Sequence, residues 1–166
     1  MKSPLHSRLI MNSLEEENKM GNRAVITTEK NFRIGGVGVY LHWNGGRDSV
    51  QAFLLYCKLR GFRPPEQDNY GWARMCQVIG NFFGGGLSIG IDNLDSLDCD
   101  NWDNGVYLIR DWEIVGRRYF EGTEQNEYDL LDMVLGINND QPEGDRLPEE
   151  EIKTGVYDYL HPNPFF

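Results

Sequence analysis

The apolar residues between Asp48 and Arg60 recur at every third or fourth position, which is the period of an α-helix. This apolar stripe consists of Val50, Phe53, Leu54 and Cys57. Asp48 stands where a helix N-cap is expected, with Gln51 three residues later as the second half of a capping box. Gly61 can adopt the left-handed backbone that ends a helix. The pattern therefore predicts a helix over 48–60.

Two further stretches, from about Asn69 to Phe83 and from about Glu124 to Ile137, have the same helical period. The stripe of the first consists of Trp72, Met75, Cys76, Ile79 and Phe83. The stripe of the second consists of Tyr128, Leu131, Val134 and Leu135. The glycines at 84–86 end the first stretch, and both stretches predict amphipathic helices with one face in a core.

Short β-branched or alternating apolar runs outside these helices predict strands. The predicted strands cover 23–28, 37–43, 87–91, 106–110 and 113–120. A turn-like stretch at 31–36 joins the first two strands into a predicted hairpin, and the last two strands also predict a hairpin. Asn104-Gly105 is a strong turn signal just before the fourth strand.

The elements therefore follow the order β-β-α-α-β-β-β-α. Strands that cluster in hairpins with helices between them predict an α+β fold, in which an antiparallel-rich sheet of about five strands carries helices on one face. We expect residues 21–140 to form a single globular α+β domain. Residues 1–20 have no sustained apolar period and are expected to form a flexible N-terminal extension. Residues 141–166 are expected to form an acidic, partly irregular C-terminal tail.

The composition is typical of a folded protein from a reducing compartment. The 166 residues are 40% hydrophobic and 12% aromatic, which suffices for one core without disulfides or metals. The three cysteines share no CxxC spacing and the three histidines lie far apart, so neither a disulfide framework nor a metal site is predicted. No stretch is apolar enough to span a membrane, and the first residues lack the apolar core of a signal peptide. We therefore expect a cytoplasmic protein without a metal.

Charge is distributed unevenly along this chain, whose formal net charge is −10. Between 20 and 91, eight bases stand against four acids, whereas 92–103 holds five acids and no base. The stretch 121–151 holds eleven acids and one base. This polarity predicts a mildly basic side and a strongly acidic side that face different partners. The acidic excess argues against direct binding of nucleic acid.

A glycine loop between a predicted strand and the helix over 48–60 is the best candidate for a ligand site. It consists of Asn44, Gly45, Gly46, Arg47, Asp48 and Ser49. Two glycines let a backbone approach a phosphate, the N–H groups of a helix N-terminus attract anions, and Arg47 adds a fork of donors. The alternative is a purely structural connection, in which the glycines serve the turn and Asp48 serves as the cap.

The same six residues resemble the SGGxDS loop of the PP-loop ATP pyrophosphatases, which follows a strand and opens a helix. The resemblance implies a loop that holds the phosphates of ATP. Asn44 replaces the first serine of that pattern, and Pro64-Pro65 follow the helix where that fold has a parallel strand. Beyond such a nucleotide, no cofactor is predicted.

A second candidate site is a stretch with five carboxylates in twelve residues. It consists of Asp92, Asp95, Asp98, Asp100 and Asp103. The spacing does not fit an EF-hand calcium loop, which needs a glycine at the sixth position, where Asp103 stands. A solvated loop or a surface for a basic partner is the expected role.

No arrangement of residues predicts catalysis. Ser49 and Ser88 have no histidine at a telling spacing, and the glycines at 84–86 lack the following Lys-Ser or Lys-Thr of a Walker motif. Several aromatic residues fit core or rim positions, with stacking on a base or ribose as the alternative. These residues are Trp43, Tyr70, Trp72, Trp102 and Trp112.

Taken whole, residues 21 to about 147 resemble a family of small bacteriophage and mobile-element proteins to which no activity is assigned. The resemblance rests on 21–28, 40–50, 70–74 and 77–86. It implies a context of compact accessory proteins, which often disarm host defence by masking a nuclease or by sequestering a nucleotide signal.

Three functions follow as hypotheses. The first, which we favour, is a non-enzymatic anti-defence inhibitor whose acidic stretch from Asp92 onward occupies the basic groove of a nucleic-acid-binding host protein. The second is a nucleotide- or phosphate-binding protein, or a small nucleotide-directed enzyme, centred on the loop 44–49. The third is an assembly module whose Phe165-Phe166 end docks on a neighbour.

Overall fold

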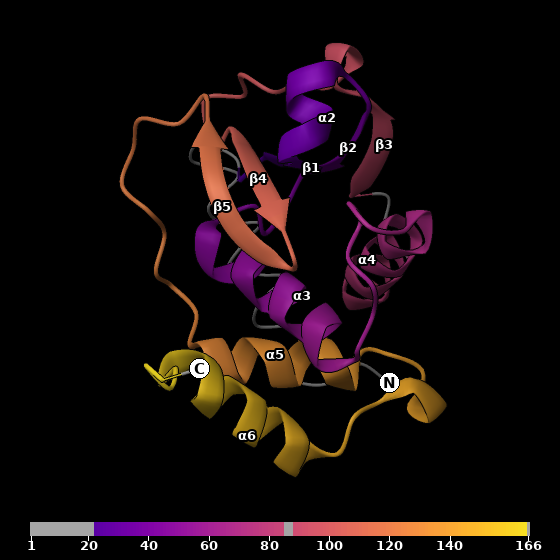
Figure 1. Cartoon of the computed structure of the whole chain (residues 1–166), viewed down its shortest axis with the longest axis vertical. Coiled ribbons are helices and arrows are strands. Elements are labelled where there is room, and N and C mark those ends of the chain that lie inside the picture. The colour runs from indigo at the N-terminus through magenta and orange to yellow at the C-terminus, as the bar shows by residue number, and fades with distance from the viewer. Residues whose placement is uncertain (1–21, 85–87, 166) are drawn as a thin grey trace.

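Residues 22–84 and 88–165, which the computed structural model describes, fold around a five-stranded mixed sheet (Figure 1). The strands are β1 (Ala24–Thr28), β2 (Val37–Leu41), β3 (Ile89–Asn93), β4 (Val106–Arg110) and β5 (Glu113–Arg118). Their spatial order is β3-β2-β1-β4-β5, and all neighbours are antiparallel except β1 and β4, which run parallel. The prediction of an α+β fold with an antiparallel-rich sheet of about five strands is confirmed.

The centre of the sheet is formed by β1 and β4 because their side chains suit burial on both faces. All five residues of β1 and the first four of β4 are buried, as expected for continuous apolar strands that are covered on both sides. The predicted β4–β5 hairpin turns at Asp111 and Trp112, whose φ angles are 51° and 61°. A two-residue turn of this kind requires left-handed backbone at both positions.

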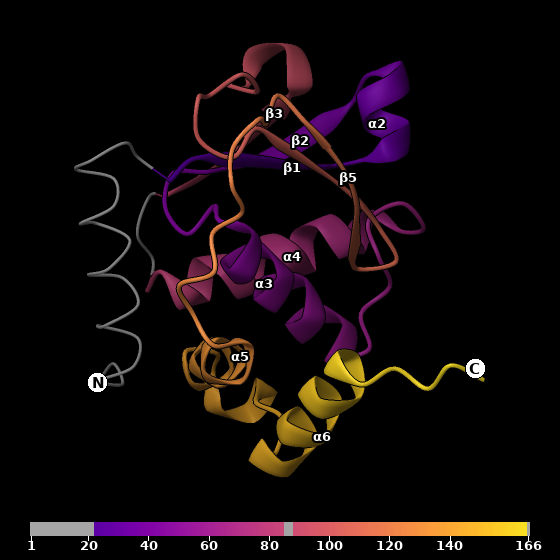
Figure 2. The same ribbon diagram turned by 90° about the vertical axis from the view of Figure 1, so that its left-hand side faces the viewer.

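Four helices of the described chain cover one face of the sheet in two layers (Figure 2). α3 (Arg47–Leu59) and α4 (Asn69–Phe82) lie next to the sheet, and α5 (Leu130–Asn139) and α6 (Glu149–Leu160) lie beyond them. The main apolar core extends from this face of the sheet through both helix layers, and Tyr56, Phe53, Phe82 and Tyr107 are its largest buried side chains. The helices predicted over 48–60 and 69–83 are confirmed to within one residue at each end.

The other face of the sheet carries a smaller apolar cluster. Val25, Val106 and Leu108 are buried there, and partly buried side chains of Phe32, Leu94 and other residues pack against them. Phe32 belongs to the short helix α2 (Glu29–Ile34), and Leu94 begins the 3-10 turn η1 (Leu94–Ser96). The expectation that helices pack on only one face is therefore wrong.

The helix α2 occupies most of the stretch 31–36, which the sequence predicts as a turn. The hydroxyl oxygen of Thr28 accepts a hydrogen bond from the Asn31 N–H at 3.1 Å and caps the helix. α2 is six residues long and has no buried residue. An apolar period cannot reveal so short and exposed a helix.

Two C-terminal elements also differ from the prediction. α5 begins at Leu130 rather than near Glu124, because Asp129 caps it by accepting the Asp132 N–H at 3.1 Å. The stretch 141–166, expected as a partly irregular tail, contains the helix α6, which buries Ile152 and Val156. Its N-terminal signal was in the sequence, as a proline followed by three glutamates in the first turn.

The predicted N-terminal extension, 1–20, lies outside the described residues, as do Gly85, Gly86 and Phe166. No helix in the described ranges is both long enough and apolar enough to cross a membrane.

Candidate functional site

The glycine loop that the sequence marks as a ligand site is enclosed by the protein itself. Asn44, Gly45, Gly46, Asp48 and Ser49 are buried, and Arg47 is half-buried. Tyr107 donates its hydroxyl hydrogen to the Gly45 carbonyl at 2.7 Å. Asn44 has left-handed backbone, with a φ angle of 52°, and its side-chain nitrogen donates a hydrogen bond to the Ser49 hydroxyl at 3.2 Å. The loop thus makes its close contacts inside the fold.

The two glycines are required by contacts with neighbouring chain segments. A Cβ atom at Gly45 would lie 2.5 Å from the Asn22 carbonyl oxygen, which belongs to the backbone leading into β1. A Cβ atom at Gly46 would overlap the side-chain oxygen of Gln125. The segment around Gln125 therefore lies where a phosphate would have to approach this loop.

The N-terminus of α3 already faces an anion, the carboxylate of Asp48. This carboxylate accepts hydrogen bonds from the N–H groups of Ser49 at 2.7 Å, Glu127 at 2.8 Å and Tyr128 at 3.0 Å. Burial raises the pKa of the Asp48 carboxyl, against the opposing effect of these N–H donors. The prediction that Asp48 is the N-cap is wrong, because Gly46 holds that position and makes no side-chain bond.

The loop is also tied electrostatically to the segment that leads into α5. An Arg47 guanidinium nitrogen lies 3.6 Å from a Glu124 carboxylate oxygen, and Arg117 contacts the same carboxylate. The predicted ligand residues thus do come together, but as a junction between the start of α3 and the chain before α5.

Of the five predicted partner-binding carboxylates, four are exposed and one, Asp103, has a buried side chain. The Asp103 side chain is almost fully buried. Its carboxylate accepts two hydrogen bonds from Arg23, one from the backbone N–H at 3.0 Å and one from the guanidinium Nε at 2.7 Å. These contacts raise the pKa of Arg23, chiefly through the side-chain hydrogen bond to Asp103. Asp98 lies 3.5 Å from the same guanidinium. The remaining three, Asp92, Asp95 and Asp100, are exposed.

The separation of charge seen along the sequence is only partly kept in space. Bases of the first half pair with acids of the second half, as in Arg23–Asp103 and Lys58–Glu113. These ion pairs join the two halves, and the expectation of two sides that face different partners stays a prediction. Neutralisation is nevertheless incomplete, because some exposed charges keep no ion-pair partner among the described residues.

The structure adds an open hollow next to the acidic stretch, with a volume of about 680 Å³. We call it the Trp102 hollow. It is lined by Asp100, Trp102, Asp103, Tyr119, Phe120, Glu121 and Gly122. Trp102 is 86% exposed and Tyr119 is 55% exposed, so two large aromatic side chains face solvent beside carboxylates.

The backbone that displays these aromatic side chains is strained. Trp102 and Tyr119 have φ angles of 63° and 56°, in the left-handed region that favours glycine. Such conformations cost on the order of 1–3 kcal/mol each and persist only where the surroundings impose them. Asn44, Asp111 and Trp112 have the same backbone conformation, so it is the exposure of Trp102 and Tyr119 beside carboxylates that makes the Trp102 hollow the leading candidate.

A buried asparagine fixes the loop that carries Trp102. The side-chain nitrogen of Asn101 donates to the carbonyls of Asp98 and Gly105 at 3.0 and 3.2 Å. Its side-chain oxygen accepts the N–H groups of Asp103 and Gly105 at 3.1 and 3.0 Å. All of these bonds lie within the loop, so the backbone at Trp102 is held in place before any partner arrives.

The opposite wall of the hollow is held by Arg117. Its guanidinium lies 3.8 Å from the ring centre of Phe120 and 4.0 Å from that of Tyr107, and it donates to the Asn104 carbonyl at 2.7 Å.

Of the residues that line the hollow, the sequence predicted Asp100 and Asp103 as site residues but not Tyr119, Phe120 and Glu121. The available signal was Trp102 itself, because a tryptophan within an acidic run is poorly suited to a core.

The thiols and potential metal ligands suggest no chemistry. Burial raises the pKa of Cys76 to about 11 and raises that of Cys57 further, which keeps both thiols protonated and unreactive. Among residues 22–84 and 88–165, no group of three or more His, Cys, Asp or Glu side chains is placed to hold a metal ion.

Comparison of the chain with protein-family models, curated proteins and solved structures found no match. The Trp102 hollow and the charges around it are therefore the basis on which a function can be inferred.

Proposed function

We propose that this protein is a non-enzymatic binding protein that holds a basic protein partner in the Trp102 hollow. The observation that carries the proposal is the pairing of two exposed aromatic side chains, Trp102 and Tyr119, with the carboxylates of Asp100 and Glu121 in one hollow. A lysine or arginine side chain is attracted both to the face of an aromatic ring and to a carboxylate. The hollow offers both kinds of contact.

The charges in the hollow are available to a partner. Asp100 and Glu121 are exposed and form no ion pair with any described residue. Asp103 is already neutralised by Arg23, so it supports the loop rather than the partner. The partner contact therefore depends on Asp100 and Glu121, with Asp92 and Asp95 as nearby exposed carboxylates that add long-range attraction.

Trp102 is the expected centre of the interaction energy. Interfaces draw most of their binding energy from a few residues, among which tryptophan and tyrosine are enriched. Because Asn101 fixes the loop in advance, little conformational entropy is lost when a partner binds. Because Trp102 is exposed, it buries little apolar surface in the fold and keeps that surface for a partner.

A phage or mobile-element context would give this surface a specific role. A host defence protein that grips nucleic acid presents a basic groove, and an acidic protein with a preformed aromatic anchor can occupy that groove. We therefore propose an anti-defence inhibitor that acts in the host cytoplasm. Its attraction to the partner should weaken as salt screens the exposed carboxylates.

Binding of a fluorescent arginine-rich peptide, followed by anisotropy at several salt concentrations, tests the proposal. Trp102→Ala and Asp100→Asn should each weaken binding, with Trp102→Ala losing about tenfold or more. Two matched controls remove an exposed aromatic residue and an exposed acid elsewhere, Tyr157→Ala and Glu143→Gln. Equal losses in the two controls would show that binding is not localised to the Trp102 hollow and would contradict the proposal.

The alternative, a nucleotide held by the loop 44–49, has less support. A phosphate at that loop would have to displace the Gln125 side chain and compete with the Asp48 carboxylate for the Ser49 N–H at the start of α3. We therefore do not propose that loop as the ligand site.

A further inference from the structure

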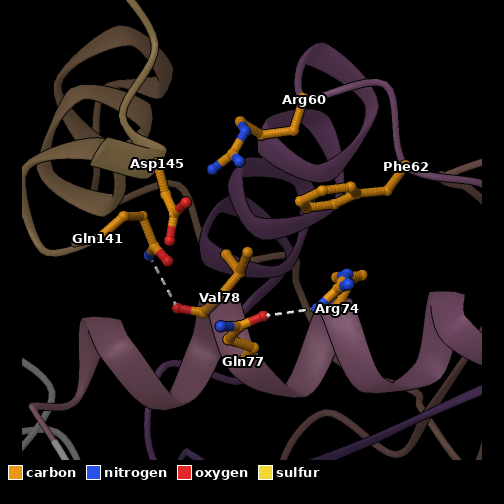
Figure 3. A pocket seen from close by; sticks show the side chains of 7 residues that line it. All are labelled: Arg60, Phe62, Arg74, Gln77, Val78, Gln141 and Asp145. Carbon is orange, nitrogen blue, oxygen red and sulfur yellow. Dashed lines mark hydrogen bonds between the residues drawn. The ribbon is translucent and has the colours of Figure 1, made fainter. Parts of the chain in front are cut away.

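A second pocket, lined mainly by polar side chains, lies at the other end of the molecule from the Trp102 hollow. In Figure 1 the chain around residue 100 crosses one end, whereas the loop between α5 and α6 lies at the opposite end. The pocket has a volume of about 210 Å³ and is lined by Arg60, Phe62, Arg74, Gln77, Val78, Gln141 and Asp145 (Figure 3). We call it the Arg60–Arg74 pocket.

The two arginines of this pocket have charge to offer a ligand. Within the described ranges, neither Arg60 nor Arg74 forms an ion pair with a carboxylate. Arg74 donates to the Gln77 side-chain oxygen at 3.2 Å, and the Arg60 guanidinium lies 5.0 Å from the ring centre of Phe62. In a chain of net charge −10, two arginines at one pocket that pair with no carboxylate of residues 22–84 and 88–165 provide the charge and the donors of an anion site.

The frame of the pocket is rigid. Phe62 donates its N–H to the Cys57 carbonyl at 3.2 Å and accepts the Trp112 indole N–H at 2.7 Å. Gln141 is buried, and its side-chain nitrogen donates to the carbonyls of Val78 at 3.1 Å and Ile137 at 3.0 Å. The walls are therefore in place before a ligand binds, as is usual for small-molecule sites.

A second hollow adjoins the pocket and enlarges it on the side of Phe62. It has a volume of about 320 Å³ and shares Phe62 and Arg74 with the first. Tyr70, which is 63% exposed, lines it together with Arg63. Aromatic side chains at this hollow can stack against a flat ring while the arginines hold an anionic group.

Asp145 lies on the wall that faces Arg60 (Figure 3). Its carboxylate also forms no ion pair with a described residue, so it leaves a negative charge at one end of the pocket. This charge would repel additional phosphate groups. The pocket is thus suited to a ligand with one phosphate.

We propose that the Arg60–Arg74 pocket binds a nucleoside monophosphate. The phosphate lies between Arg60 and Arg74, and the base lies in the adjoining hollow against Phe62 and Tyr70. Each of the two guanidinium groups can donate two hydrogen bonds to the phosphate, and together they outweigh the single negative charge of Asp145. This site is separate from the Trp102 hollow and does not depend on the partner proposed there.

Isothermal titration of the full chain with the four ribonucleoside monophosphates, inorganic phosphate, adenosine and ATP tests this proposal. At least one monophosphate should bind in a saturable manner, more tightly than phosphate, adenosine or ATP. Arg60→Gln and Arg74→Gln should each weaken it about tenfold or more. The exposed Arg33 serves as control, and Arg33→Gln should leave binding unchanged.

Asp145→Asn keeps the test valid if either arginine variant unfolds, because Asp145 is exposed and its substitution leaves the core intact. This variant should narrow the preference for monophosphate over ATP. If no monophosphate binds in a saturable manner up to about 10 mM, the proposal is overturned, since a larger dissociation constant corresponds to too little binding free energy for a specific site. Binding that survives Arg60→Gln and Arg74→Gln, or phosphate binding as tight as that of a nucleotide, would also overturn it.

Discussion

Replacing Asp48 by alanine should cost the protein a large part of its stability. The variant leaves three backbone N–H groups without their carboxylate acceptor, and two of them, at Glu127 and Tyr128, lie 79 and 80 residues away in sequence. Hydrogen bonds to a charged acceptor contribute about 1.5–3 kcal/mol each. Counting only the two distant bonds at the lower value, we expect a loss of about 3 kcal/mol in the free energy of unfolding.

Urea denaturation followed by circular dichroism measures this loss. With a slope of about 2 kcal/mol per molar urea, the midpoint should fall by about 1.5 M. Asp129→Ala is the matched control, because Asp129 makes a single helix-cap bond to the Asp132 N–H and should lose only about 1 kcal/mol. If Asp48→Ala were no more destabilising than Asp129→Ala, the view of the loop 44–49 as a structural junction would be refuted.

Three further predictions concern the same framework. Gly45→Ala should destabilise the fold more than Gly46→Ala in the same urea assay, because its Cβ meets the fixed backbone of Asn22 rather than a movable side chain; the reverse order would contradict the packing. Burial raises the pKa of Asp48 in the folded state above its ordinary value of 3.8, so its contribution to stability is complete below that value and declines as pH rises through the folded pKa. Relative to Asp48→Asn, the native chain should therefore gain stability as the pH falls from neutral to about 4, and a relative loss would contradict this sign. Cys76, whose pKa is raised to about 11, should react slowly with iodoacetamide near neutral pH and much faster in urea, as mass spectrometry would show; equal rates would mean that the thiol is not protected.

Local patterns in the sequence predict the elements with strong apolar periods. The helices α3 and α4 each bury a full stripe, and the β4–β5 hairpin has its turn between two short runs that contain β-branched residues. The helix α2 escapes such patterns because it is six residues long, has no fully buried residue and begins at the Thr28 cap. The parallel pairing of β1 with β4 joins strands about 80 residues apart, and no local period reports such a contact.

The candidate sites, like the helices and strands, could be predicted from the sequence only in part. The glycines of the loop 44–49 correctly indicate a tight approach, but sequence alone does not say whether a phosphate or the Gln125 segment approaches. The stretch 92–103 correctly marks Asp100 as exposed and acidic. It could not reveal Tyr119 and Glu121, because only the β4–β5 hairpin returns the chain to that loop.

The most direct test of the proposed partner surface follows the indole N–H signals of the tryptophans by NMR while an arginine-rich peptide is added to the ¹⁵N-labelled protein. We expect the Trp102 signal to shift and saturate, because that ring faces solvent beside Asp100. The buried Trp112, whose indole donates to the Phe62 carbonyl, should stay unchanged. A Trp102 signal that does not respond while the peptide binds elsewhere would contradict the proposal that this hollow receives a basic partner.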